Sequence, residues 1–114
     1  MEKIIKLKER RDYNRLYRIG KTFVDPCFVL YKAKGRTTGV RLGITTSKKL
    51  GIAVMRNRAR RVITAAFREC LPHIKSGTDI VIVARTRILK LKSTEVAVLL
   101  KKQLINADLW EENA

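Results

Sequence analysis

The stretch that most constrains the fold runs from Ser47 to Cys70, where a helical apolar pattern coincides with dense positive charge. It reads SKKLGIAVMRNRARRVITAAFREC and contains seven Lys or Arg residues. Projected as a helix at about 100° per residue, residues 53–71 place one set of apolar side chains on a single side: Ala59, Val62, Ile63, Ala66, Phe67 and Cys70. This face predicts a helix that is anchored to a hydrophobic core and leaves its other sides exposed.

The other sides of this predicted helix are polar and basic. They carry Asn57, Arg61, Thr64 and Arg68 opposite the apolar face, Arg58 and Arg60 on its flanks, and Arg56 near the start. Arginines on a helix surface are balanced by acidic residues three or four positions away from them. Only Glu69 is available within the predicted helix. Dense arginine without acidic partners favours a phosphate ligand over plain solvation, and guanidinium suits bidentate phosphate contacts.

The charge of the whole chain agrees with a polyanionic partner. Among 114 residues, 26 are Lys or Arg and 10 are Asp or Glu, which gives a net charge of +16. Nucleic acid is the favoured partner and an anionic membrane the second. The length and the 46% apolar content predict one folded domain, residues 1–114. No segment resembles a signal peptide or is long enough to span a bilayer, so we expect a cytoplasmic protein.

The remaining elements are predicted from caps and periodicity. The first is a helix from Asp12, as N-cap, to Gly20, with Leu16 and Ile19 facing the core. Strands are expected at 27–34 and 40–49, joined by an antiparallel hairpin at 35–39, and at 79–85, where the strand is apolar enough to be buried on both faces. Ser93 is expected to cap a last helix, in which Val96, Leu99, Leu100 and Leu104 form an apolar stripe.

This order, α-β-β-α-β-α with a further short strand possible, predicts an α+β fold in which helices pack against a small mixed sheet. The two cysteines, Cys27 and Cys70, lie far apart in the sequence. A disulfide is possible, but two buried free thiols in a reducing compartment are favoured.

Three tyrosines define a second candidate surface. Tyr13 and Tyr17 are four residues apart on the first helix, and strand alternation turns Tyr31 away from Phe28 and Leu30. The three rings could line one groove in which Arg11, Arg15 and Lys32 lie nearby. Aromatic rings beside basic residues hold single-stranded nucleic acid, but ordinary core or rim packing would also satisfy three tyrosines. The residues alone leave these two interpretations even.

The sequence gives little support for protein-based catalysis. The single histidine, His73, follows Pro72 and has no partner in the sequence pattern that would make it a general base. The carboxylates are scattered, without the close pairs that hold two metal ions for phosphodiester cleavage. A stand-alone protein nuclease is therefore not expected.

The segment SKKLGIAVMRNRARR resembles the signature of the bacterial ribonuclease P protein subunit, which centres on an Arg-Asn-Arg motif. RRDYNRLYRIGK is similar to the N-terminal helix of that family, FVLYKAK to its first strand, RLGITTSKKLG to the strand that leads into the motif, and DIVIVAR to the strand that follows. The family usually has Asn at the position of Ile52, and TRILKLKS after Arg85 follows the family pattern only loosely.

This resemblance implies a fold like domain 2 of ribosomal protein S5, with a left-handed β-α-β crossover at the arginine helix. It implies a subunit of the ribonucleoprotein that removes the 5′ leader of precursor tRNA, with catalysis in the RNA subunit, which also binds most of the Mg²⁺. Residues implied to bind the RNA subunit are Arg56, Asn57, Arg58, Arg60, Arg61, Arg68, Lys48 and Lys49. Residues implied to bind the leader are Tyr13, Tyr17, Tyr31, Arg11, Arg15, Lys32 and Ser47.

Two other classes of protein fit some of these features. A structural RNA-binding protein of ribosomal type would share the size, the charge and the basic helix, but such proteins often carry long basic tails that this chain lacks. A DNA-binding regulator fits less well, because Pro72 and a strand follow the basic helix where a helix-turn-helix would need a second helix. No membrane and no obligate protein partner are predicted, and the sequence leaves open whether the protein itself binds a metal ion.

Overall fold

A five-stranded mixed sheet forms the centre of the computed structural model, which describes residues 4–112. Along the sheet the strands lie in the order β1-β4-β5-β3-β2. β4 is parallel to both β1 and β5, whereas β3 is antiparallel to β5 and to β2. The strands are β1 (Ile5–Lys6), β2 (Lys21–Asp25), β3 (Phe28–Lys34), β4 (Val40–Thr45) and β5 (Thr78–Ala84).

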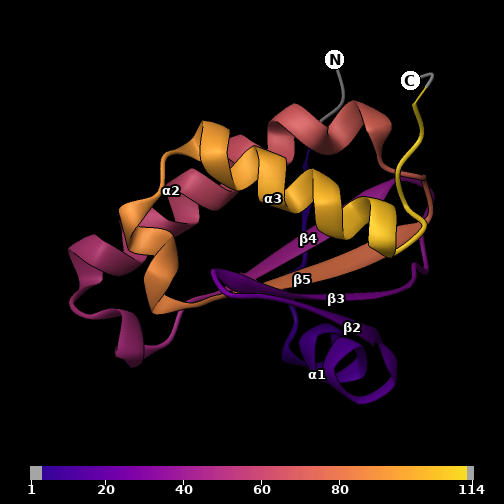
Figure 1. Cartoon of the computed structure of the whole chain (residues 1–114). Coiled ribbons are helices and arrows are strands. Elements are labelled where there is room, and N and C mark those ends of the chain that lie inside the picture. The colour runs from indigo at the N-terminus through magenta and orange to yellow at the C-terminus, as the bar shows by residue number, and fades with distance from the viewer. Residues whose placement is uncertain (1–3, 113–114) are drawn as a thin grey trace.

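Helices cover both faces of this sheet, which confirms the predicted α+β class. α1 (Arg10–Ile19) lies on one face, and α2 (Ala53–Cys70) packs beside α3 (Ser93–Asn106) on the other (Figure 1). The buried residues of α2 are the six that the helical projection placed on one side. The arginine segment is therefore anchored as its apolar spacing predicts.

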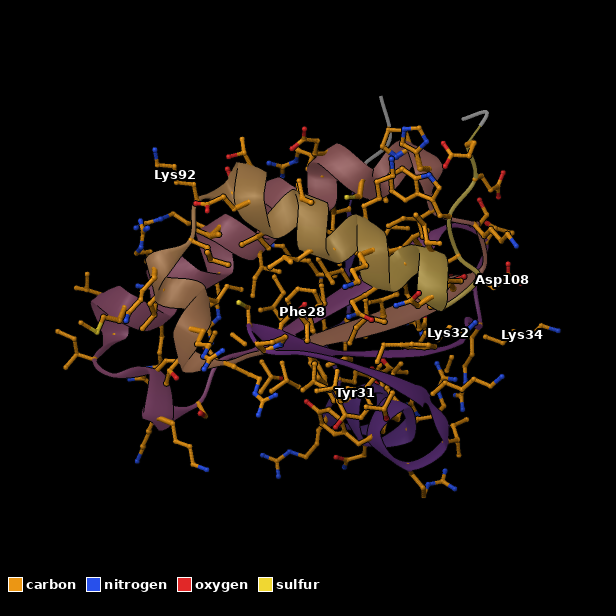
Figure 2. All side chains as sticks on the ribbon, viewed as in Figure 1. Phe28, Tyr31, Lys32, Lys34, Lys92 and Asp108 are labelled. Carbon is orange, nitrogen blue, oxygen red and sulfur yellow. The ribbon has the colours of Figure 1, made fainter. Side chains whose placement is uncertain are left out.

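The main hydrophobic core lies between the sheet and the α2–α3 layer. Phe28 and Leu30 of β3, Ile80 of β5 and Phe67 of α2 are fully buried there, and burying each such side chain stabilises the fold by about 1.5–3 kcal/mol. The opposite face of the sheet has a smaller core under α1. Figure 2 shows the alternation of β3 directly, with Phe28 directed toward α3 and Tyr31 toward α1.

The strand predicted at 79–85 is β5, and it occupies the centre of the sheet as its apolar run indicates. Six of its seven residues are buried. The hairpin predicted at residues 35–39 is wrong, because β5 lies between β3 and β4. An apolar strand must be covered along both edges as well as on both faces, so β5 pairs with β3 and with β4, and the 35–39 connection passes over its end.

The β-hairpin joins β2 and β3, one strand earlier than predicted. β2 pairs with β3 around a two-residue turn, Pro26–Cys27, with Asp25 opposite Phe28. The sequence prediction missed β2, and it also missed β1, although it allowed one further short strand. The second predicted strand was too long, because β4 ends at Thr45 and residues 48–50 form a short 3₁₀ turn, η1 (Lys48–Leu50).

The β4-α2-β5 connection forms a β-α-β unit, because β4 and β5 are parallel neighbours and α2 lies between them in the chain. The left hand of this crossover stays a prediction that follows from the family resemblance.

Both predicted N-caps are wrong by one to three residues. Asp12 lies in the first turn of α1, after Glu9 at the cap position, and Ser93 is the first residue of α3, after Lys92. The backbone N–H of Lys92 donates to the Glu95 carboxylate at 3.0 Å, which supplies the cap that Ser93 was expected to provide. Ile19 was predicted to face the core but is 55% exposed.

A buried carboxylate joins α1 to the sheet. Asp79 of β5 is fully buried and accepts hydrogen bonds from Arg41 Nε at 2.9 Å, from Arg41 Nη2 at 2.6 Å and from Arg15 Nη2. Arg41 Nη2 also lies 3.7 Å from Asp12 Oδ1. The hydrogen bonds from Arg41 to Asp79 raise the pKa of Arg41. Side chains of α1, β4 and β5 are thus held by one charge cluster.

The cysteines are both free and buried, as predicted. Burial raises the pKa of the Cys70 thiol to about 11, so this thiol stays protonated and unreactive near neutral pH.

Candidate nucleic-acid interface

The exposed side of α2 is strongly basic. Arg60, Arg61 and Arg68 are exposed, as is Asn57. Among residues 4–112, no arginine of α2 forms an ion pair with a carboxylate. The excess of guanidinium over acidic side chains that the sequence predicted is therefore present on the folded surface.

Arg58 and Arg56 lie closer to the body of the protein. Arg58 reaches the 3₁₀ segment η3 (Thr86–Lys90) and the residue after it, with Nε 3.5 Å from the Leu89 carbonyl oxygen and Nη2 3.5 Å from that of Leu91. Arg56 is half-buried, and its Nε has no hydrogen-bond partner in the described part of the chain. A buried donor without a partner costs about 1–3 kcal/mol, and such groups are retained where another role requires them.

The turn that precedes α2 places further cations at the start of that helix. The Ser47 hydroxyl accepts a hydrogen bond from the backbone N–H of Lys49 at 3.3 Å, and Leu50 is buried, so Lys48 and Lys49 are held outward. Ile52 occupies the N-cap position of α2, makes no side-chain cap bond and is 69% exposed. An Asn at this position would be a good N-cap residue.

Tyr17 and Tyr31 are in direct contact across the gap between α1 and the sheet. Their ring centroids lie 5.0 Å apart with an interplanar angle of 79°, an edge-to-face arrangement. The Tyr17 hydroxyl is 2.7 Å from Thr45 Oγ1 at the end of β4, and the Tyr17 side chain is 40% exposed. The contact holds the ring of Tyr17 in place while leaving part of it open.

Tyr13 is half-buried, whereas Tyr17 is exposed. Its hydroxyl donates to the Leu7 carbonyl oxygen at 3.3 Å, and its ring lies against the backbone of Gly43. A Cβ on Gly43 would be 2.7 Å from that ring, so only glycine permits this approach. Burial raises the pKa of the Tyr13 phenol. Tyr13 therefore serves packing on one side and lines a hollow on the other.

The three tyrosines line two adjoining hollows rather than one groove. The first, with a volume of about 550 Å³, is lined by Lys8, Arg10, Tyr13, Asn14, Tyr17 and Thr45. The second, of about 590 Å³, contains Tyr31 together with Thr22, Val29, Ser47, Lys49 and Arg85. We call them the Tyr17 hollow and the Tyr31 hollow; the contact between the two rings joins them.

Two of the predicted basic neighbours of the tyrosines lie elsewhere. Arg15 is engaged by Asp79 and the Lys34 carbonyl oxygen and is nearly buried, so it fastens α1 to the sheet. Lys32 donates to the Ala107 carbonyl oxygen on the other face, because the alternation that separates Tyr31 from Leu30 also separates it from Lys32. Arg11 is exposed and pairs with Glu9 at 2.6 Å.

The cations that do border the hollows are Lys8, Arg10, Lys49 and Arg85. The sequence prediction missed Lys8, Arg10 and Arg85, although the place of Lys8 and Arg10 at the start of the first tyrosine-bearing helix was a usable signal. It assigned Lys49 to the arginine surface alone. In the structure Lys49 and Ser47 belong to the Tyr31 hollow and also lie at the entry to α2.

His73 is held by contacts with residues near the end of the chain. Its ring stacks on Trp110 with centroids 4.4 Å apart and planes 10° apart, and its Nδ1 lies 2.8 Å from the Glu111 carbonyl oxygen. Within residues 4–112, no cluster of three or more His, Cys, Asp or Glu side chains is arranged to hold a metal ion. No helix in the same range is long and apolar enough to cross a membrane.

A small α+β fold with a basic helix on one face and aromatic hollows beside it has the features expected of a protein that binds RNA. The family model described as Ribonuclease P matches residues 1–108. The chain therefore belongs to the ribonuclease P protein family, the protein subunits of that enzyme.

Relatives and solved structures agree over nearly the whole chain. The ribonuclease P protein component of Caldanaerobacter subterraneus is 33% identical over 111 residues, which cover 97% of this chain and 96% of the relative. The Staphylococcus aureus RNase P protein superposes with a TM-score of 0.83 at 31% identity, covering 96% of this chain and 100% of the other. The Thermotoga maritima protein gives 0.74 at 28%, covering 90% and 93%.

Proposed function

We propose that α2 and the turn before it bind the RNA subunit, and that the Tyr17 and Tyr31 hollows hold the single-stranded 5′ leader of precursor tRNA. The observation that carries this proposal is the position of Ser47 and Lys49. These residues line the Tyr31 hollow and also form the turn from which α2 begins. One bound surface can therefore run from the arginines to the tyrosines without a break.

Electrostatics supports the assignment of α2 to structured RNA. Its exposed guanidiniums lack carboxylate partners among the described residues, and phosphate contacts of this kind release counterions, which drives binding. Arg56 adds a buried Nε donor without a partner. A bound phosphate at the outer nitrogens of Arg56 would offset part of the cost of keeping this side chain half-buried.

The hollows suit single-stranded rather than double-stranded RNA. Tyr17 and Tyr31 present partly open aromatic surface, and Lys8, Arg10 and Lys49 lie at the rims. Unpaired bases stack on such rings at about 1–3 kcal/mol per base, largely independently of base identity. A subunit that must accept many precursor tRNAs needs this tolerance.

The chemistry is proposed to reside in the RNA subunit, with Mg²⁺ bound mainly there. His73 stacks on Trp110, and the buried Asp79 is paired with two arginines, so neither side chain is free to act as a general base or a metal ligand. The protein then contributes by positioning precursor tRNA on the RNA subunit and by neutralising phosphate charge that Mg²⁺ would otherwise have to screen.

Tyr17→Ala is expected to weaken binding of precursor tRNA to the assembled enzyme and to leave mature tRNA, which lacks the leader, unaffected. The expected loss is about 1–3 kcal/mol if one base stacks on this ring. Tyr17→Phe is the matched control, because it keeps the ring and removes only the hydroxyl bonded to Thr45. Equilibrium binding with both RNAs is the measurement. Equal losses for both RNAs would show that Tyr17 supports the fold or the RNA-subunit contact instead.

A further inference from the structure

A third basic surface lies at the other end of the sheet. A hollow of about 440 Å³ is lined by Lys21, Lys32, Lys34 and Lys75, together with Ile19 and Ser76 among others. We call it the lysine hollow. It includes Thr78, where β5 begins, whereas the turn before α2 follows the end of β4, which is parallel to β5. Figure 2 shows Lys32, Lys34 and Asp108 together at this end.

The charges around the lysine hollow are unbalanced. Lys75 Nζ lies 3.4 Å from Asp108 Oδ1, but the Asp108 side chain is 93% exposed and is the one carboxylate paired there within residues 4–112. Lys32 donates to a carbonyl oxygen, that of Ala107, and gains no counter-charge from it. Lys21 and Lys34 have no ion pair in the described chain.

The sheet register increases this imbalance. Lys21 of the edge strand β2 lies directly opposite Lys32 of β3. Like charges in directly opposed cross-strand positions are destabilising. A bound anion would remove the repulsion, and it could approach along the outer edge of β2, which pairs with no other strand of the described chain.

The lysine hollow adjoins the tyrosine surface on β3. Ala33 lines the lysine hollow, and Tyr31 lines the Tyr31 hollow. The two residues lie two positions apart on the same face of the strand, under α1. Successive residues rise by about 3.3 Å in a strand, so a chain leaving the tyrosines reaches the lysine hollow within a few nucleotides.

We propose that the lysine hollow binds phosphates of the leader upstream of the nucleotides that the tyrosines hold. This inference rests on the proposed function, because it extends the same leader path around the end of the sheet. Lys21 and Lys34 supply the free charge, whereas Lys32 and Lys75 are already oriented by Ala107 and Asp108. The contact is to the phosphate backbone, so it discriminates by leader length and not by leader sequence.

The test compares the assembled enzyme containing Lys21→Ala/Lys34→Ala with wild type on precursor tRNAs with a short and a long leader. Loss of two phosphate contacts should weaken binding of the long-leader RNA and flatten its salt slope by about 1.4, at about 0.7 per contact for single strands. The short-leader RNA and mature tRNA should bind as before. Lys21→Arg/Lys34→Arg should restore the long-leader affinity, and Lys102→Ala, on an exposed position of α3, should have no leader-dependent effect.

An equal loss for short and long leaders would overturn the proposal, because the lysines would then contact the RNA subunit or the tRNA body. Unchanged binding of the long-leader RNA would overturn it as well. Inorganic phosphate is the remaining probe: if it competes at the lysines while leader length has no effect, the hollow is a free-anion site. The expected effect of Tyr17→Ala does not depend on how far the leader extends past the tyrosines. Failure of the lysine proposal would therefore leave the proposed function standing.

Discussion

Replacing Asp79 with Ala is expected to destabilise the protein by about 3–5 kcal/mol, the usual effect of breaking a buried ion pair by removing one partner. The Asp79 side chain is fully buried, and both Arg15 and Arg41 donate to it. Without it Arg15 loses its carboxylate partner, Arg41 keeps only Asp12 at 3.7 Å, and the ion pair between α1 and β5 is lost. Because small domains are stable by only about 5–15 kcal/mol, this single change should bring the protein close to unfolding.

Urea unfolding followed by circular dichroism measures this effect. Asp12→Ala is the control, since Asp12 lies 3.7 Å from Arg41 without a direct hydrogen bond to it, and its removal should cost far less. If Asp79→Ala lowers the free energy of unfolding by less than about 1 kcal/mol, the effect would be no larger than that of an exposed ion pair. This result would contradict a structural role for the cluster.

Replacing Arg60 and Arg61 together with Ala is expected to give the largest loss of binding to the RNA subunit. Both side chains are exposed, and neither has an ion pair among residues 4–112. Removing one phosphate-binding side chain should reduce the salt slope of binding by about one, so the double variant should reduce it by about two. Unfolding free energy should change little, because exposed charges contribute little to stability.

The measurement is a filter-binding or calorimetric titration with the RNA subunit at several salt concentrations. Lys102→Ala on α3 is the control for a non-specific change in net charge, and it should leave the slope nearly unaltered. An unchanged slope in the double variant would remove these two arginines from the phosphate-binding surface and would shift the proposed interface toward the Ser47–Lys49 turn.

The sequence predicted the arginine helix well because its signal is local. Six apolar residues at helical spacing fixed which face is buried, and the structure buries the same six. The buried central strand was likewise evident from its unbroken apolar run. In both elements the pattern depends on the residues of one segment and on no partner.

Strand pairing could not be predicted in the same way. Residues 35–39 have the composition of a hairpin turn, yet β5 lies between the strands they connect. The arrangement depends on residues 78–84, which are distant in the sequence and form a strand that pairs along both of its edges. The short strand β1 has only two residues and no periodicity to detect, and β2 was overlooked because Pro26 marked a boundary rather than a two-residue turn.

The candidate site was predicted in part. The i, i+4 spacing of Tyr13 and Tyr17 and the alternation at Tyr31 correctly placed the rings on the α1 side of the sheet. Arg15 and Lys32 were misplaced for different reasons. The partner of Arg15, Asp79, is 64 residues away in the sequence and leaves no local trace. Lys32 lies two residues from Leu30 in the same strand. The alternation that separates Leu30 from Tyr31 therefore also places Lys32 on the opposite face from Tyr31, which the sequence could have shown.

Cleavage of precursor tRNA by the RNA subunit at low Mg²⁺, with and without this protein, tests the central claim most directly. The protein is expected to accelerate removal of the 5′ leader at a Mg²⁺ concentration where the RNA alone cleaves slowly. This acceleration should depend on Arg60 and Arg61 for assembly and on Tyr17 for leader-bearing substrate. Tight binding to the RNA subunit with no change in the cleavage rate would contradict the account.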